Sequence, residues 1–126
     1  MASRNELILE TILGAENELQ DPQSRNEAIL QAILYNTEYT EEARSRIEEL
    51  LIAILNGEEV DFEPRSENEK ILKYVLNKAI YEEDGRSRIA ELLVLWSKQE
   101  ADPERFKFPF RIDEGNPVEM SVVSEG

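Results

Sequence analysis

The chain has 126 residues, enough for one domain, and its 28 Asp and Glu residues against 14 Lys and Arg residues give a formal net charge of -14. It has no His and no Cys, which excludes Ser-His-Asp and Cys-His triads, disulfides and His/Cys zinc sites. The acidic charge argues against binding to nucleic-acid phosphates or to an anionic membrane, because both need Lys and Arg. Its apolar runs are too short to span a bilayer, and the start M-A-S-R-N-E lacks the apolar stretch of a signal peptide.

A 21-residue repeat occupies most of the chain. Its five copies begin at Ser residues that are each 21 residues apart, namely Ser3, Ser24, Ser45, Ser66 and Ser87. Similar strings follow each Ser, such as S-R-N-E-A-I-L-Q-A-I-L in the second copy and S-R-I-E-E-L-L-I-A-I-L in the third. Five copies in one phase indicate a repeat architecture.

Each copy opens with residues that are typical of a helix N-terminus. In a capping box, a Ser hydroxyl accepts a first-turn N–H, and a Glu three residues later accepts the N–H of that Ser. Four copies have this pattern, at Ser3/Glu6, Ser24/Glu27, Ser45/Glu48 and Ser66/Glu69, whereas the fifth has Ala90 in the place of the Glu. The pattern predicts helices that begin at or next to the five Ser residues.

Apolar residues then recur with helical spacing. They stand five, six, nine and ten residues after the Ser, as in Ile29, Leu30, Ile33 and Leu34 of the second copy. This spacing places them in one stripe along a helix. Helices of about 12 to 15 residues are marginal in water, so the stripes must bury against neighbours.

The residue two positions after the Ser differs between copies. It is Asn in three copies and Ile in two, namely Asn5, Asn26 and Asn68 against Ile47 and Ile89. Because Ile lengthens the stripe, we interpret the third and fifth copies as the more buried helices. These differences pair the copies at a 42-residue period, so we expect helical hairpins at 24–65 and 66–105, with the first copy outside the pairing. The short polar linkers suit antiparallel connections. Helices with narrow stripes bury little surface in one chain, and Asn sets register in helical assemblies, so we expect a homo-oligomer, either a trimer or a dimer.

The pattern changes to a period of two after Pro103. Apolar residues alternate with polar ones or Pro on both sides of the turn-like sequence D-E-G-N-P. This predicts a β-hairpin or two extended arms, with Pro109 restricting its strand to an edge. The expected fold is therefore all-α, with five short helices in a repeat domain at 1–105 and an extended or β-hairpin attachment segment at 106–126.

Apolar residues of this segment, together with Trp96 in the last repeat, are the candidates for binding a partner. Trp96 replaces an aliphatic stripe residue. The apolar face has two possible outcomes: it packs back on the last helix around Trp96, or it adds a strand to the sheet edge of a partner. The candidates are Trp96, Phe106, Phe108, Phe110, Ile112, Val118, Met120 and Val122.

The charged residues suggest no reaction. Dense carboxylates such as Glu82, Glu83 and Asp84 are typical of a solvated surface, so we nominate no catalytic, cofactor-binding or metal-binding residue and expect a protein that is not an enzyme. Arg residues flank the Ser in most copies, as Arg44 and Arg46 do. They either form salt bridges to Glu of a neighbouring repeat or make bidentate contacts between subunits.

Two segments resemble those of virion accessory proteins of tailed bacteriophages, including head-fibre and capsid or tail attachment proteins. They are P-Q-S-R-N-E-A-I-L-Q-A-I-L at 22–34 and S-R-I-E-E-L-L-I-A-I-L at 45–55. The resemblance implies a non-enzymatic virion component, assembled in the host cytoplasm, that oligomerises and docks on another virion protein. The acidic charge predicts that it contacts neither nucleic acid nor membrane directly. The alternative, from the acidic charge, is a small inhibitor of a host protein that acts by nucleic-acid mimicry.

Overall fold

The five repeat copies form five helices. The computed structural model describes residues 3–106 with their side chains and the backbone of 111–113 and 116–118. Each helix begins at the residue after the repeat Ser, whose hydroxyl accepts the N–H three residues further on, as predicted. The helices are α1 (Arg4–Ile12), α2 (Arg25–Tyr35), α3 (Arg46–Asn56), α4 (Glu67–Leu76) and α5 (Arg88–Ala101). Two strands, β1 (Arg111–Asp113) and β2 (Asn116–Val118), pair antiparallel.

The capping Glu residues differ from the prediction in what they bind. The reciprocal capping box forms in α1, where the Ser3 N–H donates to the Glu6 carboxylate at 3.0 Å. In α2, α3 and α4 the carboxylate instead accepts the N–H of the residue before the Ser, at distances of 2.8 to 3.0 Å. In those three helices the Glu therefore fixes the end of the preceding linker. The Ser half of the predicted capping box is confirmed there, and the Glu half is wrong.

The Ser caps are expected to contribute measurably to stability. Replacing Ser45 by Ala should lower the free energy of unfolding by about 1 kcal/mol, because the Glu48 N–H loses its acceptor. Urea titration followed by circular dichroism measures the change. Thr40→Ala, at an exposed site in the linker before α3, is the matched control and should leave the midpoint unchanged.

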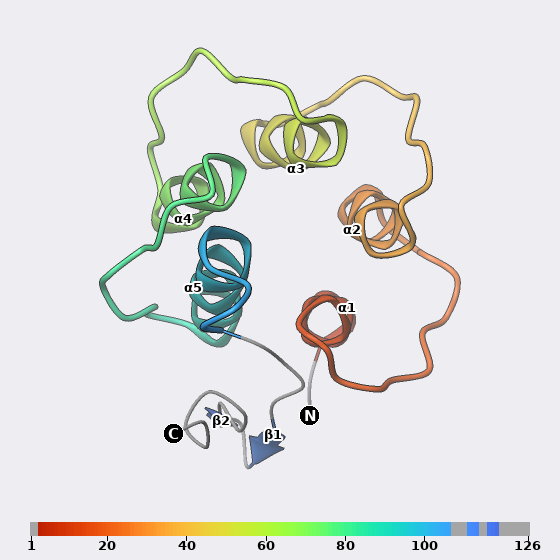
Figure 1. Ribbon diagram of the computed structural model, residues 1–126. Coiled ribbons are helices and arrows are strands. Elements are labelled where there is room, and N and C mark those ends of the chain that lie inside the picture. The colour runs from red at the N-terminus through yellow and green to blue at the C-terminus, as the bar shows by residue number, and fades with distance from the viewer. Residues whose placement is uncertain (1–2, 107–110, 114–115, 119–126) are drawn as a thin grey trace.

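The five helices close into a ring. Each helix contacts the next along the chain, and α5 also contacts α1 (Figure 1). The apolar stripes of all five helices meet in one hydrophobic core, while the linkers pass around the outside of the ring (Figure 1). Linker residues Tyr39, Val60, Phe62 and Tyr81 belong to this core or pack against it, which holds the linkers to the helices.

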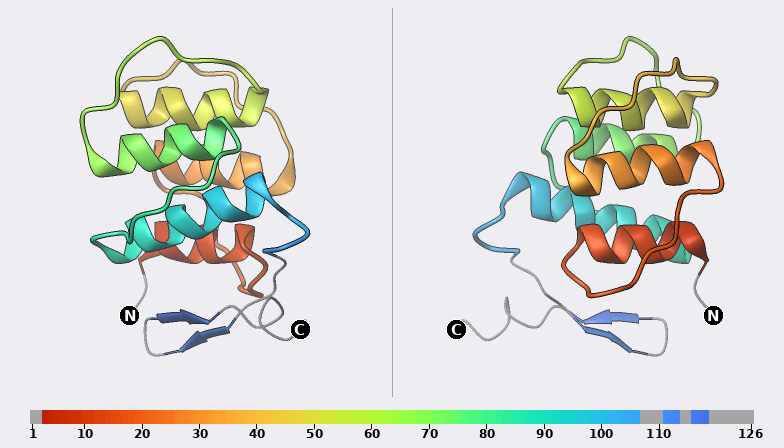
Figure 2. Two further views of the ribbon diagram at one scale, coloured as in Figure 1. Left: turned by 60° about the vertical axis from the view of Figure 1, so that its left-hand side comes forward. Right: turned by 90° about the vertical axis from the view of Figure 1, so that its right-hand side faces the viewer.

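All five helices run in the same direction, so the expected helical hairpins at 24–65 and 66–105 are wrong. Each linker returns along the helix that has just ended and starts the next helix at the same end of the ring (Figure 2). The linkers at 36–45 and 57–66 are long enough for this. Ten extended residues reach about 33 Å, whereas a helix of 11 residues is about 16 Å long.

Ring closure covers the apolar stripes inside one chain. In α5 every residue from Leu92 to Ser97 is buried, as expected for a more buried helix, but α3 is no more deeply buried than α2. The narrow stripes that motivated the expectation of self-association pack against each other within the ring. The oligomeric state itself remains a prediction.

Candidate functional site

A pocket of about 240 Å³ lies on the axis of the ring. It is lined by residues from two repeat positions of every helix, two and six residues after the cap Ser. The outer set, Asn5, Asn26, Ile47, Asn68 and Ile89, is half-buried. The inner set, Leu9, Leu30, Leu51, Leu72 and Leu93, is only 2–4% exposed. The pocket is therefore a leucine-walled hollow with a mixed rim of carboxamides and Ile, at the end of the ring where the helices begin.

The three Asn side chains of the rim are not used by the fold. Asn5 Oδ1 is buried without a hydrogen-bond partner, and the amides of Asn26 and Asn68 bond to no other residue in the described part of the chain. The sequence predicts that these Asn set register in a helical assembly. The structure places them around a pocket inside one chain.

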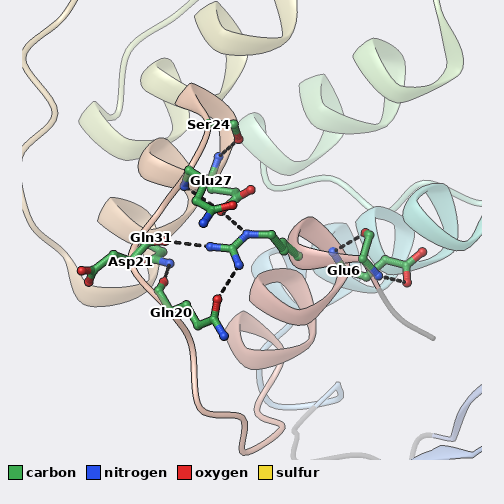
Figure 3. Close-up of polar contacts among 9 residues, drawn as sticks. Glu6, Gln20, Asp21, Ser24, Glu27 and Gln31 are labelled. Carbon is green, nitrogen blue, oxygen red and sulfur yellow. Dashed lines mark hydrogen bonds and ion pairs between the residues drawn. The ribbon is translucent and has the colours of Figure 1, made fainter.

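Ion pairs link the first turns of neighbouring helices. Arg4 Nε lies 2.9 Å from Glu27 Oε1, and Arg25 Nη2 lies 3.0 Å from Glu48 Oε1, with both carboxylates buried. The Arg4 guanidinium also donates to Gln20 Oε1 and to the backbone carbonyl of the next residue, both at 2.7 Å (Figure 3). The interpretation of these Arg residues as salt-bridge partners of the neighbouring repeat is confirmed for Arg4 and Arg25.

Between α4 and α5 both members of the Arg–Glu pair are replaced by other residues. There Glu67 stands in the place of the Arg and Ala90 in the place of the Glu. Glu67 instead accepts the Arg86 N–H at 3.2 Å, the backbone group that the missing Glu would have bound. Gly85 packs closely against this turn, since an added Cβ would lie 2.5 Å from the Ala90 carbonyl carbon. Gly85 and Ala90 are both small, so the backbone of the last linker packs against the first turn of α5 at the position where the other repeats have the Glu.

Two polar contacts join α5 to α1, in addition to the shared hydrophobic core. Arg88 Nη2 lies 3.3 Å from Glu10 Oε2, and Gln99 Nε2 donates to the Ile12 carbonyl at 3.3 Å. Glu10 is buried, although it stands one turn further along α1 than the Glu that serves the other pairs. The first and last repeats thus recognise each other through a variant of the same Arg–Glu contact.

The buried carboxylates have altered acidities. A hydrogen bond from the Gln23 N–H, supported by the Arg4 guanidinium, lowers the pKa of Glu27. Burial by itself raises the pKa of Glu48, but the Arg44 N–H and the Arg25 guanidinium outweigh it, so the net pKa of Glu48 is also lowered. Both groups therefore favour the ionised state in the folded protein.

These acidities predict that the protein loses stability in acid. Both folded-state pKa values lie below the ordinary value of 4.5, so the stabilisation is complete above that pH and is lost as pH falls through the folded pKa. Urea midpoints measured from pH 6 to pH 3 should decrease accordingly. Glu48→Gln should cost about 1.5 kcal/mol at pH 7 and flatten the profile. Glu49→Gln, exposed on the same helix, is the control, and an unchanged profile for Glu48→Gln would contradict the assignment.

Two of the eight candidate partner-binding residues are buried in the described structure. Trp96 is 1% exposed, and helical spacing places it on the same face of α5 as Leu93. Phe106 is 6% exposed and lies under two cations, with Lys98 Nζ 5.6 Å and the Arg105 guanidinium carbon 4.8 Å from its ring centre. Both residues therefore pack within this chain.

The structure does not describe the side chains of the other six candidates. Ile112 and Val118 belong to β1 and β2, of which the structure describes the backbone, and the remaining four lie outside the described residues: Phe108, Phe110, Met120 and Val122. The sequence did not reveal the pocket, although the alternation of Asn and Ile two residues after the Ser was its signal. That alternation becomes meaningful once the five positions are known to share an axis.

In the part of the chain that the structure describes, no group of three or more acidic residues is arranged to hold a metal ion, and no helix is both long and apolar enough to cross a membrane. Comparisons of the chain with protein-family models, with curated proteins and with solved structures find no match.

Proposed function

We propose that the protein is a non-enzymatic attachment module, in which the helical ring is a rigid head and residues 107–126 dock on another protein. The observation that supports this is ring closure. In the part of the chain that the structure describes, the five apolar stripes bury each other, so none of these stripes is left open to cover another apolar segment. The resemblance of segments 22–34 and 45–55 to head-fibre and attachment proteins makes a tailed-phage particle the proposed setting.

Strand addition is the proposed mode of docking. Apolar residues alternate along 106–112 and 118–122, which suits a strand that presents one face to a partner. A two-stranded hairpin is marginal in water by itself, so a third strand from a partner would stabilise it. Pro109 has no N–H to donate, which favours pairing through one edge of its strand.

Truncation after Phe106 tests the proposal. The variant lacking 107–126 should keep the helical circular dichroism and the melting temperature of the full chain, because the ring and Phe106 are intact. It should no longer co-sediment with phage particles purified from the strain that encodes the protein. Binding by the truncated chain, or no binding by the full chain, would contradict the proposal.

The same pair of proteins tests self-association and the alternative function. Since the ring covers its own stripes, we propose that any homo-oligomer forms through the C-terminal segment, so that the truncated chain sediments as a monomer. Retention of a host nucleic-acid-binding protein by the truncated chain, released by salt, would instead favour mimicry through the acidic surface.

A further inference from the structure

We propose that the axial pocket binds a small neutral amphiphile. Its alkyl or aryl body would lie against the five leucines, and its hydroxyl or amide head group would bond to the asparagines of the rim. This ligand site is separate from the proposed attachment segment, and either proposal can fail without the other.

The size and lining of the pocket fit the body of such a ligand. Its volume is about 240 Å³, whereas an apolar cavity of roughly 150 Å³ holds benzene. Five Leu side chains line its inner part, so the wall there is apolar. An apolar wall with a few polar groups at one end is the usual construction of a small-molecule site.

The rim contains polar groups that the fold does not need. Ile occupies the same position in α3 and α5, so the ring accepts an apolar residue there. Asn stands at this position in the other three helices, and the buried Asn5 Oδ1 has no hydrogen-bond partner. A buried polar atom without a hydrogen bond lowers stability. A ligand head group in the pocket would satisfy Asn5 Oδ1 and would also lie within the rim that Asn26 and Asn68 share with it.

The charge of the lining selects a neutral head group. No residue that lines the pocket is charged, although the chain has a net charge of -14. Two first-turn charges, Arg4 and Glu27, are paired with each other between helices. A carboxamide both donates and accepts, which matches a hydroxyl or an amide. The pocket offers no counter-charge to an ammonium or a carboxylate.

Benzyl alcohol, toluene and benzylamine are the probes for this site. Titration followed by NMR of Leu methyl groups should show saturable shifts with benzyl alcohol at the five pocket leucines and a Kd of about 1 mM. Toluene lacks the head group and should bind about fivefold more weakly. Benzylamine, which is cationic at pH 7, should cause no saturable shift.

The double variant Asn26→Ile with Asn68→Ile tests the role of the rim. Ile already stands at the equivalent position of α3 and α5, so the melting temperature of the variant should equal or exceed that of the wild type. Its preference for benzyl alcohol over toluene should disappear. Asn56→Ala, exposed at the end of α3, is the control and should keep the preference. The proposal is overturned if wild-type protein shows no saturable shift with benzyl alcohol, binds toluene equally well, or shifts at exposed Tyr35 and Tyr74 instead. These outcomes are measured on the wild-type protein, so they test the proposal even if the double variant does not fold.

Discussion

Deleting residues 1–21, which removes α1 and most of the following linker, is expected to unfold the chain or to drive it into oligomers. α1 contacts both α2 and α5, and the helix with its C-cap residue contributes Ile8, Leu9 and Leu13 to the core at 0–2% exposure. Each such side chain contributes about 1.5–3 kcal/mol, so together they approach the whole stability of a typical domain. Removal of α1 also exposes the faces of α2 and α5 that packed against it.

This outcome distinguishes a closed ring from an open array. In an open array of repeats, loss of a terminal copy breaks one interface and leaves the others intact, whereas here it breaks two. Circular dichroism and sedimentation equilibrium measure the effect. The truncation after Phe106 removes a similar length of chain and is the control, with folding retained. A four-helix fragment that is monomeric and melts cooperatively near the wild-type temperature would show that closure contributes little.

Replacing Trp96 by Ala is expected to cost about 3–5 kcal/mol, the largest loss from a single substitution in the described core. Trp96 is 1% exposed and has the largest of the fully buried side chains. Its removal from the buried face of α5 leaves a cavity in the core, and the loss of stability increases with the volume of that cavity. Urea titration followed by circular dichroism gives the change in unfolding free energy.

Tyr35→Ala is the matched control for Trp96. Tyr35 is an aromatic residue at the end of α2 that is 58% exposed, so its loss should change stability by less than about 0.5 kcal/mol. A cost below about 1 kcal/mol for Trp96→Ala would contradict the packing role. Loss of partner binding at unchanged stability would then support the other possibility that the sequence left open, a contact of Trp96 with a partner.

The helices could be predicted from the sequence because their signals are local. A cap Ser acts on a backbone N–H three residues away, and the apolar stripe has a fixed spacing, so all five helices begin where the sequence predicts. The Arg–Glu pairs could be predicted only as one of two alternatives. Whether Arg25 reaches a neighbouring repeat or another subunit depends on where the next helix lies.

Only the tertiary structure decided the direction of the helices, the closure of the ring and the pocket. A linker of ten residues can join antiparallel neighbours or return along a helix, so its length leaves direction open. Closure depends on the summed rotation between successive helices and on contacts such as Arg88 with Glu10, which are 78 residues apart. The sequence by itself determined five capped, one-sided helices, because those features arise within a few residues. The asparagines became candidate ligand groups only when closure brought all five copies around one axis.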